Sequence, residues 1–482
     1  MERFDVVIVG SGPGGATVAW RLAQTGKRIL LLERGGYLPR ERANWDAQAV
    51  FNEARYQAKE TWRDSRGHVF HPGLHYYVGG NSKVFGGVLL RLREVDFGEI
   101  AHPDGVSPAW PLPYAAFEPY YQKAEELYHV HGLRGEDPTE PPSSGPYAFP
   151  PVRHEPRIQK LFDDLKRVGH HPFHLPVAVL LDESDAGVDP HSPCIRCDAF
   201  DGYPCLTNGK ADAQIICVDP ALAAHPNLTL WTGAYVSRLI TDASGAAITA
   251  IEVERDGERL QVTGDIVVVA CGALSSALLL LRSANDAHPY GLANGSDQVG
   301  RNYMRHNNST VLAISKTPNP TKFQKTLGLN DFYFRSPDWD FPLGHIQMVG
   351  KSDGTQIKGE GLPGILQWFP EAPFDWIARH SVDFWLTSED LPLAENRVRY
   401  DGDQVVLDLT ETNQEGHRRL RHELARLSGS LDLHPHLFDR SLYLGKNVPI
   451  GGTAHQAGTL RFGTDPATSV LDLNCKAHQL DN

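Results

Sequence analysis

The first strand, turn and helix constrain the fold of this chain more than any other feature. The segment FDVVIVGSGPGGATVAWRLAQTGKRILLLERGG, from Phe4 to Gly36, passes from an apolar strand through spaced glycines into an amphipathic helix and a second apolar strand. Gly10 permits a tight turn, Gly12 lets backbone approach a pyrophosphate, and Gly15 lets the helix pack closely on the strand. The helix N-terminus offers N–H groups to phosphate. The segment therefore predicts the βαβ unit of a dinucleotide-binding domain.

An acidic residue at the end of the second strand supports this prediction. Glu33 stands where a carboxylate accepts hydrogen bonds from ribose hydroxyls. The alternative, that the glycines serve only a turn, leaves the surrounding strand, helix and acid unexplained. The fingerprint does not separate FAD from NAD. Because we find no second GxGxxG between a strand and a helix, we expect one nucleotide at one site.

The composition restricts the class of protein. The chain has 482 residues, a formal net charge of -13, 41% hydrophobic residues and 22% charged residues. This length favours two or three domains, and the balance is that of a globular protein. The negative charge argues against nucleic acids and anionic membranes and favours a small neutral substrate. The N-terminus has no signal-peptide pattern, the longest apolar run is too short for a membrane span, and the cysteines do not suggest a disulfide scaffold. We therefore expect a cytoplasmic protein.

A second glycine-rich segment, VGGNSKVFGG, covers residues 78–87. Two glycine pairs, Gly79-Gly80 and Gly86-Gly87, enclose Asn81, Ser82 and Phe85. Paired glycines let backbone lie against a flat ring system. The alternative is that the two pairs form ordinary loop turns.

Four cysteines lie in the segment CIRCDAFDGYPCLTNGKADAQIIC, at Cys194, Cys197, Cys205 and Cys217. Thiolates at such positions can bind zinc or an iron–sulfur cluster. The spacing after the first CxxC pair is irregular, and proline and glycine intervene. We therefore favour buried or loop thiols and expect no metal.

In the remaining middle of the chain, one segment is predicted to return to the nucleotide site, and the segment after it is rich in aromatic residues. Residues 227–284 alternate across turns as a β-meander, and the strand DIVVVAC ends at Cys271 and Gly272, where the edge of the sheet can meet a ligand. Within residues 311–438, Gln347 and His345 are candidate polar contacts. The aromatic residues there either wall a pocket or fill a core: Trp368, Phe369, Trp376, Phe384 and Trp385.

The segment from Gly451 to Asn482 contains His455 among small residues, in the sequence HQAGT. An imidazole with an ordinary pKa of about 6.5 is often neutral near pH 7 and can act as a base. Taken alone, such a histidine is more often a hydrogen-bonded structural residue. The other motifs of the chain favour the base.

Seven motifs in this order resemble the glucose-methanol-choline (GMC) oxidoreductase family, flavoenzymes that oxidise alcohols with FAD. They are VGSGPGGA with LERGG, VGGNSKVFGG, TGAYV, VVVACGALSSALLLLRSA, VGRNYMRH, SEDLPLAENRV and AHQAGTLRFG. The resemblance covers nearly the whole chain and is strongest to bacterial pyranose-oxidase-like and C-glycoside 3-oxidase-like members. It implies an α/β fold, α+β overall, with a Rossmann-like FAD-binding domain at 1–100, 205–310 and 440–482. A sheet-and-helix substrate domain is then inserted at 101–204 and 311–439.

The resemblance also implies roles for individual residues. FAD is expected to be non-covalent, because no histidine occurs between Gly79 and Gly87 to tether it. Gly10, Gly12, Gly15 and Glu33 are expected to bind the adenosine diphosphate half of FAD, and Val236 is expected to meet the adenine. The residues expected near the flavin ring are Gly80, Asn81, Ser82, Phe85 and Gly86, and Gly272 is expected to flank the cofactor. Further expected cofactor contacts are Ser11, Arg34, Gly79 and Cys271. The expected substrate contacts are Gln347, Trp368 and His455.

The implied reaction oxidises a secondary hydroxyl of a sugar or glycoside to a ketone. The HxxGT motif of the family falls on His455, which is expected to remove the hydroxyl proton while hydride leaves the same carbon for flavin N5. Dioxygen or another acceptor then reoxidises the flavin. Two alternatives are a flavin dehydrogenase subunit with an iron–sulfur cluster and a flavin-binding protein without catalysis.

The family pairs this histidine with an Asn or a second His on a segment that leads into a closing helix. The sequence stops at Asn482, ahead of where that segment is expected. We therefore expect the paired residue to be missing from this sequence, and Asn482 comes too early to take its role.

Overall fold

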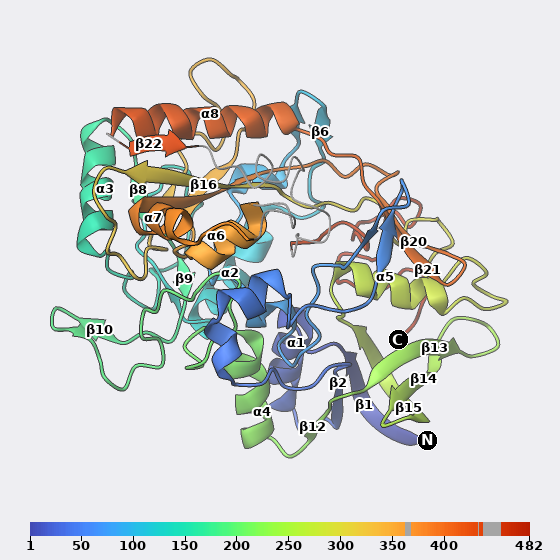
Figure 1. Cartoon of the computed structure of the whole chain (residues 1–482). Coiled ribbons are helices and arrows are strands. Elements are labelled where there is room, and N and C mark those ends of the chain that lie inside the picture. The colour runs from blue at the N-terminus through green and yellow to red at the C-terminus, as the bar shows by residue number, and fades with distance from the viewer. Residues whose placement is uncertain (362–367, 432, 437–454) are drawn as a thin grey trace.

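Two six-stranded sheets organise the chain in the computed structural model, which describes residues 1–361, 368–431, 433–436 and 455–482 (Figure 1). The first sheet contains the dinucleotide motif, and the second carries His345 and Gln347. The first residue of the AHQAGT motif and the expected domain boundary near residue 440 lie outside the described residues.

The first sheet has the strand order β12-β2-β1-β15-β14-β13. Its parallel part consists of β12 (Leu228–Trp231), β2 (Ile29–Leu32), β1 (Glu2–Val9) and β15 (Glu258–Val269). The strands β14 (Ile248–Arg255) and β13 (Tyr235–Thr241) continue it in antiparallel pairing. Together β13, β14 and β15 form the meander that the alternating pattern of residues 227–284 predicts.

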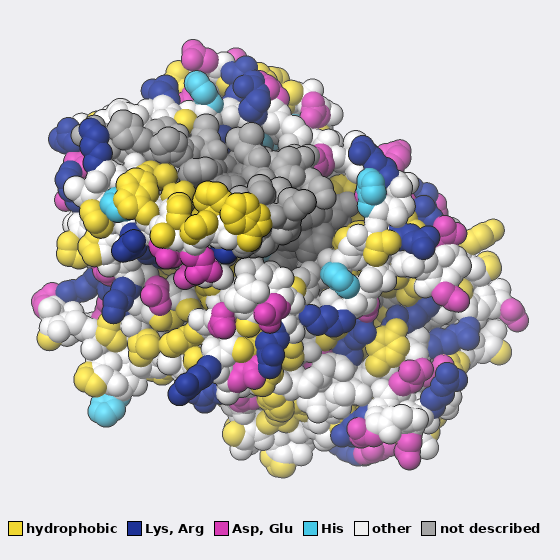
Figure 2. Space-filling model, in the orientation of Figure 1, with side chains coloured by type: hydrophobic (Ala, Val, Ile, Leu, Met, Phe, Trp, Pro, Cys, Tyr) yellow, Lys and Arg dark blue, Asp and Glu magenta, His cyan; other side chains and the backbone are white. Residues whose placement is uncertain are grey.

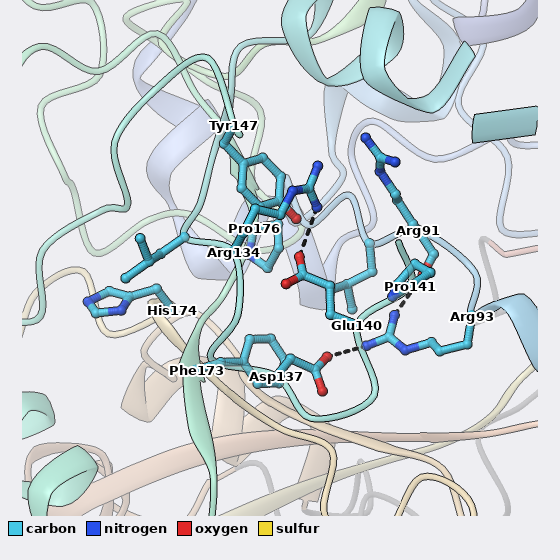
Figure 3. Close-up of a pocket in the computed structure, with 12 residues that line it drawn as sticks. Arg91, Arg93, Arg134, Asp137, Glu140, Pro141, Tyr147, Phe173, His174 and Pro176 are labelled. Atoms are coloured by element: carbon cyan, nitrogen blue, oxygen red, sulfur yellow. Dashed lines mark hydrogen bonds and ion pairs between the residues drawn. The ribbon is translucent and has the colours of Figure 1, made fainter. Parts of the chain in front are cut away.

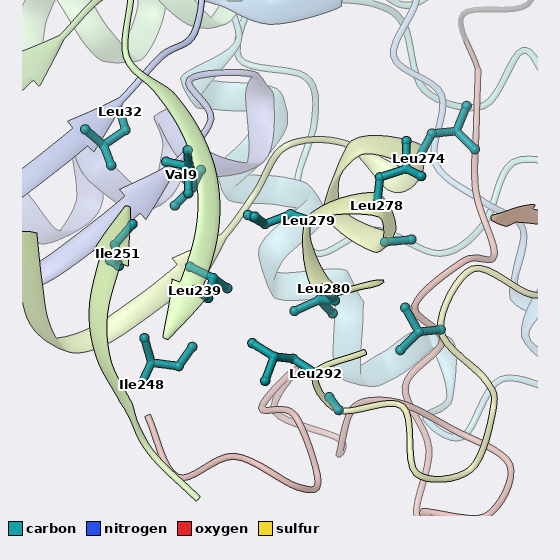
Figure 4. Packing of buried hydrophobic residues seen from close by; sticks show 14 of the residues in the cluster. Val9, Leu32, Leu239, Ile248, Ile251, Leu274, Leu278, Leu279, Leu280 and Leu292 are labelled. Atoms are coloured by element: carbon teal, nitrogen blue, oxygen red, sulfur yellow. The ribbon is translucent and has the colours of Figure 1, made fainter. Parts of the chain in front are cut away.

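Helices cover both faces of this sheet, which explains the unbroken apolar run at the N-terminus. Side chains alternate between the faces of a strand. Val6 and Ile8 pack in one apolar cluster with α1 (Pro13–Ala23) and α4 (Asp219–Ala224). Val7 and Val9 pack in another with α5 (Ala273–Arg282), whose leucines lie against β1, β2 and the meander (Figure 4). A parallel strand that is buried on both faces needs apolar residues at every position.

The second sheet is antiparallel and has the order β22-β16-β19-β18-β17-β8. Its strands are β22 (Leu433–His436), β16 (Asn307–Ser315), β19 (Ser381–Ser388), β18 (His345–Met348), β17 (Leu327–Leu329) and β8 (Pro172–His174). The amphipathic helices α3 (Pro156–Arg167) and α8 (Gln414–Ser430) bury their apolar sides with one face. From the other face, Leu312 packs against α6 (Gly354–Gly361) and α7 (Ala372–His380).

Shorter elements connect the two sheets. The strands are β3 (Trp62–Asp64), β4 (Val69–Phe70), β5 (Ile100–His102), β6 (Gly105–Ser107), β7 (Val130–His131), β9 (Val177–Ala178), β10 (Glu183–Ser184), β11 (Gly187–Val188), β20 (Arg397–Asp401) and β21 (Gln404–Asp408). The helices are α2 (Tyr114–Leu127) and the single turns η1 (Arg42–Trp45), η2 (Gln48–Asn52), η3 (Gly80–Lys83), η4 (Glu94–Phe97) and η5 (Gln214–Val218). Val398 of β20 and Leu407 of β21 share the apolar cluster of α5. The domain limits given by the resemblance stay a prediction.

The sheet order and the βαβ unit confirm the expected α/β fold with a Rossmann-like domain. Among the described residues, no helix is both long enough and apolar enough to cross a membrane.

Replacing Leu279 by Ala tests the packing of α5. Leu279 is 1% exposed and lies in the cluster that joins α5 to the sheet. Burial of this kind predicts a loss of about 2–5 kcal/mol in the free energy of unfolding. Urea denaturation followed by circular dichroism measures this loss. Leu133→Ala is the matched control, because Leu133 is 45% exposed and its loss should change stability by less than about 0.5 kcal/mol. Equal effects of the two substitutions would contradict the packing.

Candidate active site

The glycine-rich turn after β1 depends on contacts that only glycine allows. Gly10 has φ +99°, and a Cβ there would lie 2.5 Å from the carbonyl oxygen of Ala270, at the end of β15. A Cβ on Gly15 would collide with the carbonyl oxygen of Gly10. The N-terminus of α1 therefore lies directly against the turn, as the sequence predicts for a phosphate-binding loop.

The second glycine-rich segment packs on this loop. The N–H of Gly79 donates to the carbonyl oxygen of Ser11 at 3.2 Å. Gly80 has φ +57°, and a Cβ there would lie 3.0 Å from the Cα of Gly12. The two glycine motifs, far apart in the sequence, therefore form one continuous backbone surface. Gly12 itself has open space where a Cβ would lie, so the loop leaves room for a ligand.

Glu33 holds the loop in place from the end of β2. One carboxylate oxygen accepts hydrogen bonds from the backbone N–H of Ser11 at 3.2 Å and from its hydroxyl at 2.6 Å. The other accepts from the N–H of Gly35 at 2.9 Å. The oxygen that accepts from Gly35 keeps its second lone pair, so Glu33 can still accept from a ribose hydroxyl. Beside it, the guanidinium of Arg34 lies 3.7 Å from the ring centre of Tyr76.

The end of β15 supplies the third wall of this site. Gly272 has φ +80°, begins α5 and has open space at its Cβ position. The thiol of Cys271 donates to the carbonyl oxygen of Val9 at 3.3 Å, and burial raises the pKa of this thiol to about 12. The thiol of Cys271 is therefore protonated near pH 7, and its contact with the cofactor stays a prediction. Val236, expected near the adenine, is buried on β13, and its carbonyl oxygen accepts from Arg282 at 2.6 Å.

The polar side chains of VGGNSKVFGG hold the segment together. Asn81 Oδ1 accepts from the backbone N–H of His75 at 2.9 Å, and its Nδ2 donates to the carbonyl oxygen of Gly73 at 3.1 Å. The hydroxyl of Ser82 donates to the carbonyl oxygen of Gly79 at 2.6 Å. Because these groups are bonded within the protein, the backbone glycines are the part of the segment that remains to face a ring. Phe85 packs on the apolar cluster of α1.

The HQAGT motif is attached to two other motifs. Ala457 exchanges backbone hydrogen bonds with Met304 at 3.0 and 3.1 Å. Gly458 has φ +92°, and a Cβ there would collide with the carbonyl oxygen of Asn302. The hydroxyl of Thr459 donates to the carbonyl oxygen of Ala273, at the start of α5, at 2.7 Å. These contacts tie the segment that carries His455 to VGRNYMRH and to the third wall of the nucleotide site.

His306 is a neighbour of His455 that the sequence interpretation missed. Their rings meet edge to face, with centres 5.2 Å apart. Burial, followed by the charge of His455, lowers the pKa of His306 to about 4. Burial, followed by the positive charge of Lys325, also lowers the pKa of His455, although both residues keep an exposed surface. Both imidazoles are therefore neutral near pH 7. The available signal for His306 was its place at the end of VGRNYMRH.

The polar candidates of β18 form a chain of hydrogen bonds. His345 Nδ1 lies 2.7 Å from Asn330 Oδ1, and Asn330 Nδ2 donates to Asp137 at 2.6 Å. Asn330 Oδ1 therefore accepts, and His345 Nδ1 carries the proton. Burial lowers the pKa of His345 to about 4, so its Nε2 is an acceptor. It lies 3.2 Å from Gln347 Oε1, and because two acceptors do not bond, the side-chain amide has to be turned over. A neutral ring is satisfied when Gln347 presents its NH₂ to His345 and its oxygen away from the ring.

The predicted aromatic wall divides into surface and core. Trp368 is 76% exposed and Trp376 48% exposed, and hydrophobic side chains gather on the surface over α6 and α7 (Figure 2). Phe384 is 4% exposed and belongs to the core of the second sheet. Phe384 is therefore a structural residue, and the substrate contact of Trp368 stays a prediction.

The four clustered cysteines are all free. Cys205 Sγ accepts from the backbone N–H of Gly209 at 3.2 Å, and Cys217 donates to the hydroxyl of Tyr128 at 3.7 Å. Within residues 1–361, 368–431, 433–436 and 455–482, no group of three or more His, Cys, Asp and Glu side chains is placed to hold a metal ion.

A cavity of about 10 Å³, the size of one water molecule, lies among Arg91, Arg93 and Arg134 (Figure 3). Each guanidinium is paired: Arg91 with Glu125 at 2.7 Å, Arg134 with Glu140 at 2.8 Å, and Arg93 with Asp137. The predicted nucleotide and catalytic residues, all of which are described, do not line it. The charges around this cavity are compensated, so these ion pairs hold chain segments together and the cavity is not a candidate active site.

Comparisons with known proteins agree with this geometry. Residues 185–308 match the model of the GMC oxidoreductases, and residues 8–44 match an NAD(P)-binding Rossmann-like domain. The chain is 30% identical to 6'''-hydroxyparomomycin C oxidase of Streptomyces lividus, over 99% of this chain and 85% of that protein. The chain belongs to the GMC oxidoreductase family. This confirms the family that the motifs indicate.

Other GMC oxidoreductases also match along most of the chain. It is 30% identical to 5-(hydroxymethyl)furfural oxidase of Methylovorus sp. (strain MP688), over 97% of this chain and 90% of that one. The crystal structure of pyridoxine 4-oxidase from Mesorbium loti superposes with a TM-score of 0.62 at 19% identity, covering 99% of this chain and 92% of that one. The present chain is therefore an FAD-dependent enzyme that acts on CH–OH groups.

The described residues fit FAD. The N-terminus of α1 and the open positions at Gly12 and Gly272 suit the approach of a dinucleotide to bare backbone, and Glu33 retains acceptor capacity for a ribose. The individual cofactor contacts remain a prediction.

Replacing Gly15 by Ala tests the phosphate loop. The added Cβ collides with the carbonyl oxygen of Gly10 and must move α1. If the cost of overpacking, about 1–3 kcal/mol, falls on the bound state, FAD binding weakens by about 5- to 160-fold. Titration of the apoprotein with FAD, followed by flavin fluorescence, measures this change. Gly14→Ala is the matched control, because a Cβ at Gly14 meets open space. Retention of normal affinity in Gly15→Ala would refute the assigned loop geometry.

Proposed function

We propose that this GMC oxidoreductase oxidises a hydroxyl of a sugar or glycoside, with His455 as the general base. The attachment of HQAGT to Met304, Asn302 and the start of α5 is the observation that carries the proposal. Through these contacts, the histidine belongs to the same cluster of segments as the predicted nucleotide site. The lowered pKa of His455 supports the role, because a base must be unprotonated before it accepts a proton.

FAD, when bound, supplies the redox chemistry by accepting hydride. The protein places the hydroxyl and removes its proton to an unprotonated ring nitrogen of His455. His306 packs against that ring and restricts its orientation, with no charge of its own near pH 7. With its NH₂ turned towards His345, Gln347 presents its amide oxygen to accept a hydrogen bond from a second hydroxyl. This array suits a neutral polyhydroxylated substrate.

Two kinds of hydroxyl group, secondary and primary, are candidates for oxidation. The resemblance to sugar-oxidising members favours a secondary hydroxyl, which gives a ketone. A relative that is 30% identical is named for 5-(hydroxymethyl)furfural, whose hydroxymethyl group is a primary alcohol. This similarity favours oxidation of a primary hydroxyl to an aldehyde as the second candidate. The electron acceptor is dioxygen or another oxidant in either case.

Replacing His455 by Ala tests the proposed base. We expect flavin reduction by substrate under anaerobic conditions to slow by about 10²–10⁴-fold, while bound FAD persists. Stopped-flow absorbance of the flavin measures the rate. His422→Ala is the control, since His422 is exposed on α8. If the flavin of His455→Ala is reduced at the normal rate, His455 is not the base. If no substrate bleaches the flavin of the wild-type enzyme, the result favours a flavin-binding protein without catalysis.

The pH dependence of flavin reduction gives a second prediction. His455 must be neutral, and its pKa is below the ordinary value of 6.5. The rate should therefore remain high as the pH falls to 6.5 and should decline only at lower pH. Anaerobic stopped-flow measurements from about pH 4 to about pH 8, on either side of the ordinary histidine pKa, record this profile. A decline that is centred above pH 6.5 would contradict the proposed environment of His455.

The product separates the two candidate carbons. Glycosides with free primary and secondary hydroxyls should yield a ketosugar if the secondary hydroxyl reacts. Carbon-13 NMR of the product distinguishes a ketone from an aldehyde. The matched substrate is the same glycoside without its primary hydroxyl: unchanged turnover supports the ketone, and lost turnover supports the aldehyde.

A further inference from the structure

A buried ion pair lies beside the second glycine-rich segment and was not expected from the motifs. Lys325, just before β17, is 3% exposed, and its ammonium pairs with Asp201. The second carboxylate oxygen of Asp201 accepts the backbone N–H of Gly350. Asp201 thereby joins the cysteine-containing segment, to which it belongs, to residues beside β18 and β17 of the second sheet.

The pair occupies the space directly over Gly86. A Cβ on Gly86 would overlap both with Asp201 Oδ1 and with Lys325 Nζ. Gly86 is one of the residues that the family resemblance places near the flavin ring. Its lack of a side chain therefore lets an ammonium and a carboxylate reach the backbone of that segment.

The ammonium of Lys325 has unused hydrogen-bonding capacity. A lysine ammonium has three N–H donors, and Asp201 is its hydrogen-bond partner among the described residues. Buried donors are normally satisfied, because an unpaired one costs the free energy of its lost hydration. Two donors of a buried cation thus remain for an oxygen acceptor that is not part of the described chain.

The same charge acts on two histidines of the candidate site. It lowers the pKa of His455, after the larger effect of burial. It also lowers the pKa of His345, after burial and the charge of Arg93. The positive charge of Lys325 therefore favours the neutral form of both histidines.

We propose that the Lys325–Asp201 pair binds a substrate hydroxyl next to the carbon that is oxidised. The ammonium donates a hydrogen bond to the hydroxyl oxygen, and the carboxylate accepts a hydrogen bond from the hydroxyl O–H. A hydroxyl group is both donor and acceptor, so it complements a pair that offers both functions side by side. Because Asp201 neutralises Lys325, the pair favours a neutral polyol over an anionic sugar acid. This inference rests on the proposed function and adds a specificity-determining pair to it.

The test compares a sugar with its analogue that lacks the neighbouring hydroxyl. In the wild-type holoenzyme, removal of that hydroxyl should lower kcat/KM by about 10- to 100-fold, as expected for a hydrogen bond to a charged group. In Lys325→Met, kcat/KM for the parent sugar should fall by a similar factor, mainly through a higher KM. For the analogue, kcat/KM in this variant should stay close to its wild-type value. Lys322→Met is the matched control, because Lys322 is exposed in the same segment.

A second pair of variants covers the case in which Lys325→Met does not fold. Asp201→Asn keeps the size of the side chain and should also reduce the ratio of kcat/KM for the sugar to kcat/KM for its analogue. Lys325→Arg retains donors at the same place and should restore part of that ratio relative to Lys325→Met. FAD content and thermal unfolding are measured for every variant, so that loss of fold is separated from loss of recognition.

Two outcomes would overturn the inference. If Lys325→Met and Asp201→Asn discriminate between the sugar and every deoxy analogue as the wild type does, the pair does not bind a hydroxyl. If Lys325→Met slows both substrates equally and shifts the flavin absorption maximum, the spare donors serve the cofactor. A wild-type flavin that no sugar or glycoside reduces contradicts the proposed function itself, which is a different result from reduction with unchanged discrimination.

Discussion

The close approach of β1, α1 and β15 is the constraint on which the rest of the structure depends. Gly10 lies against the carbonyl of Ala270, and Gly15 lies against the carbonyl of Gly10. A side chain at either position would separate the helix from the strand or one strand from the other. With these contacts in place, the loop at Gly12 stays open, and Gly80 can pack against it. The predicted nucleotide site therefore consists of backbone from separate parts of the chain.

The proposed catalytic histidine depends on the same arrangement. The end of β15 begins α5, and the first carbonyl of α5 receives the hydroxyl of Thr459. Ala457 and Gly458 fix the segment on Met304 and Asn302. His455 consequently has a defined neighbour in His306 and a desolvated surrounding that lowers its pKa. The carboxamide of Asn482 hydrogen-bonds the backbone of Ile248 at 2.7 and 2.9 Å, so it serves the meander.

Local sequence signals predicted the βαβ unit, the meander and the structural need for Gly10 and Gly15, because turn chemistry and apolar periodicity are properties of neighbouring residues. Ordered motifs predicted the family. Neither kind of signal could predict the contact of His306 with His455 or the pair of Lys325 with Asp201, since their members are separated by more than a hundred residues. Composition also could not tell an exposed Trp368 from a buried Phe384, because both are apolar residues in mixed surroundings.

The central claim is that FAD lies on the two packed glycine motifs with its ring towards His455. A crystal structure of the FAD-loaded enzyme tests this most directly. The account predicts the pyrophosphate at the N-terminus of α1, a ribose at Glu33, and the flavin ring beside Gly86 with His455 on the side that the substrate approaches. A flavin ring that is bound away from both Gly86 and His455 would contradict it.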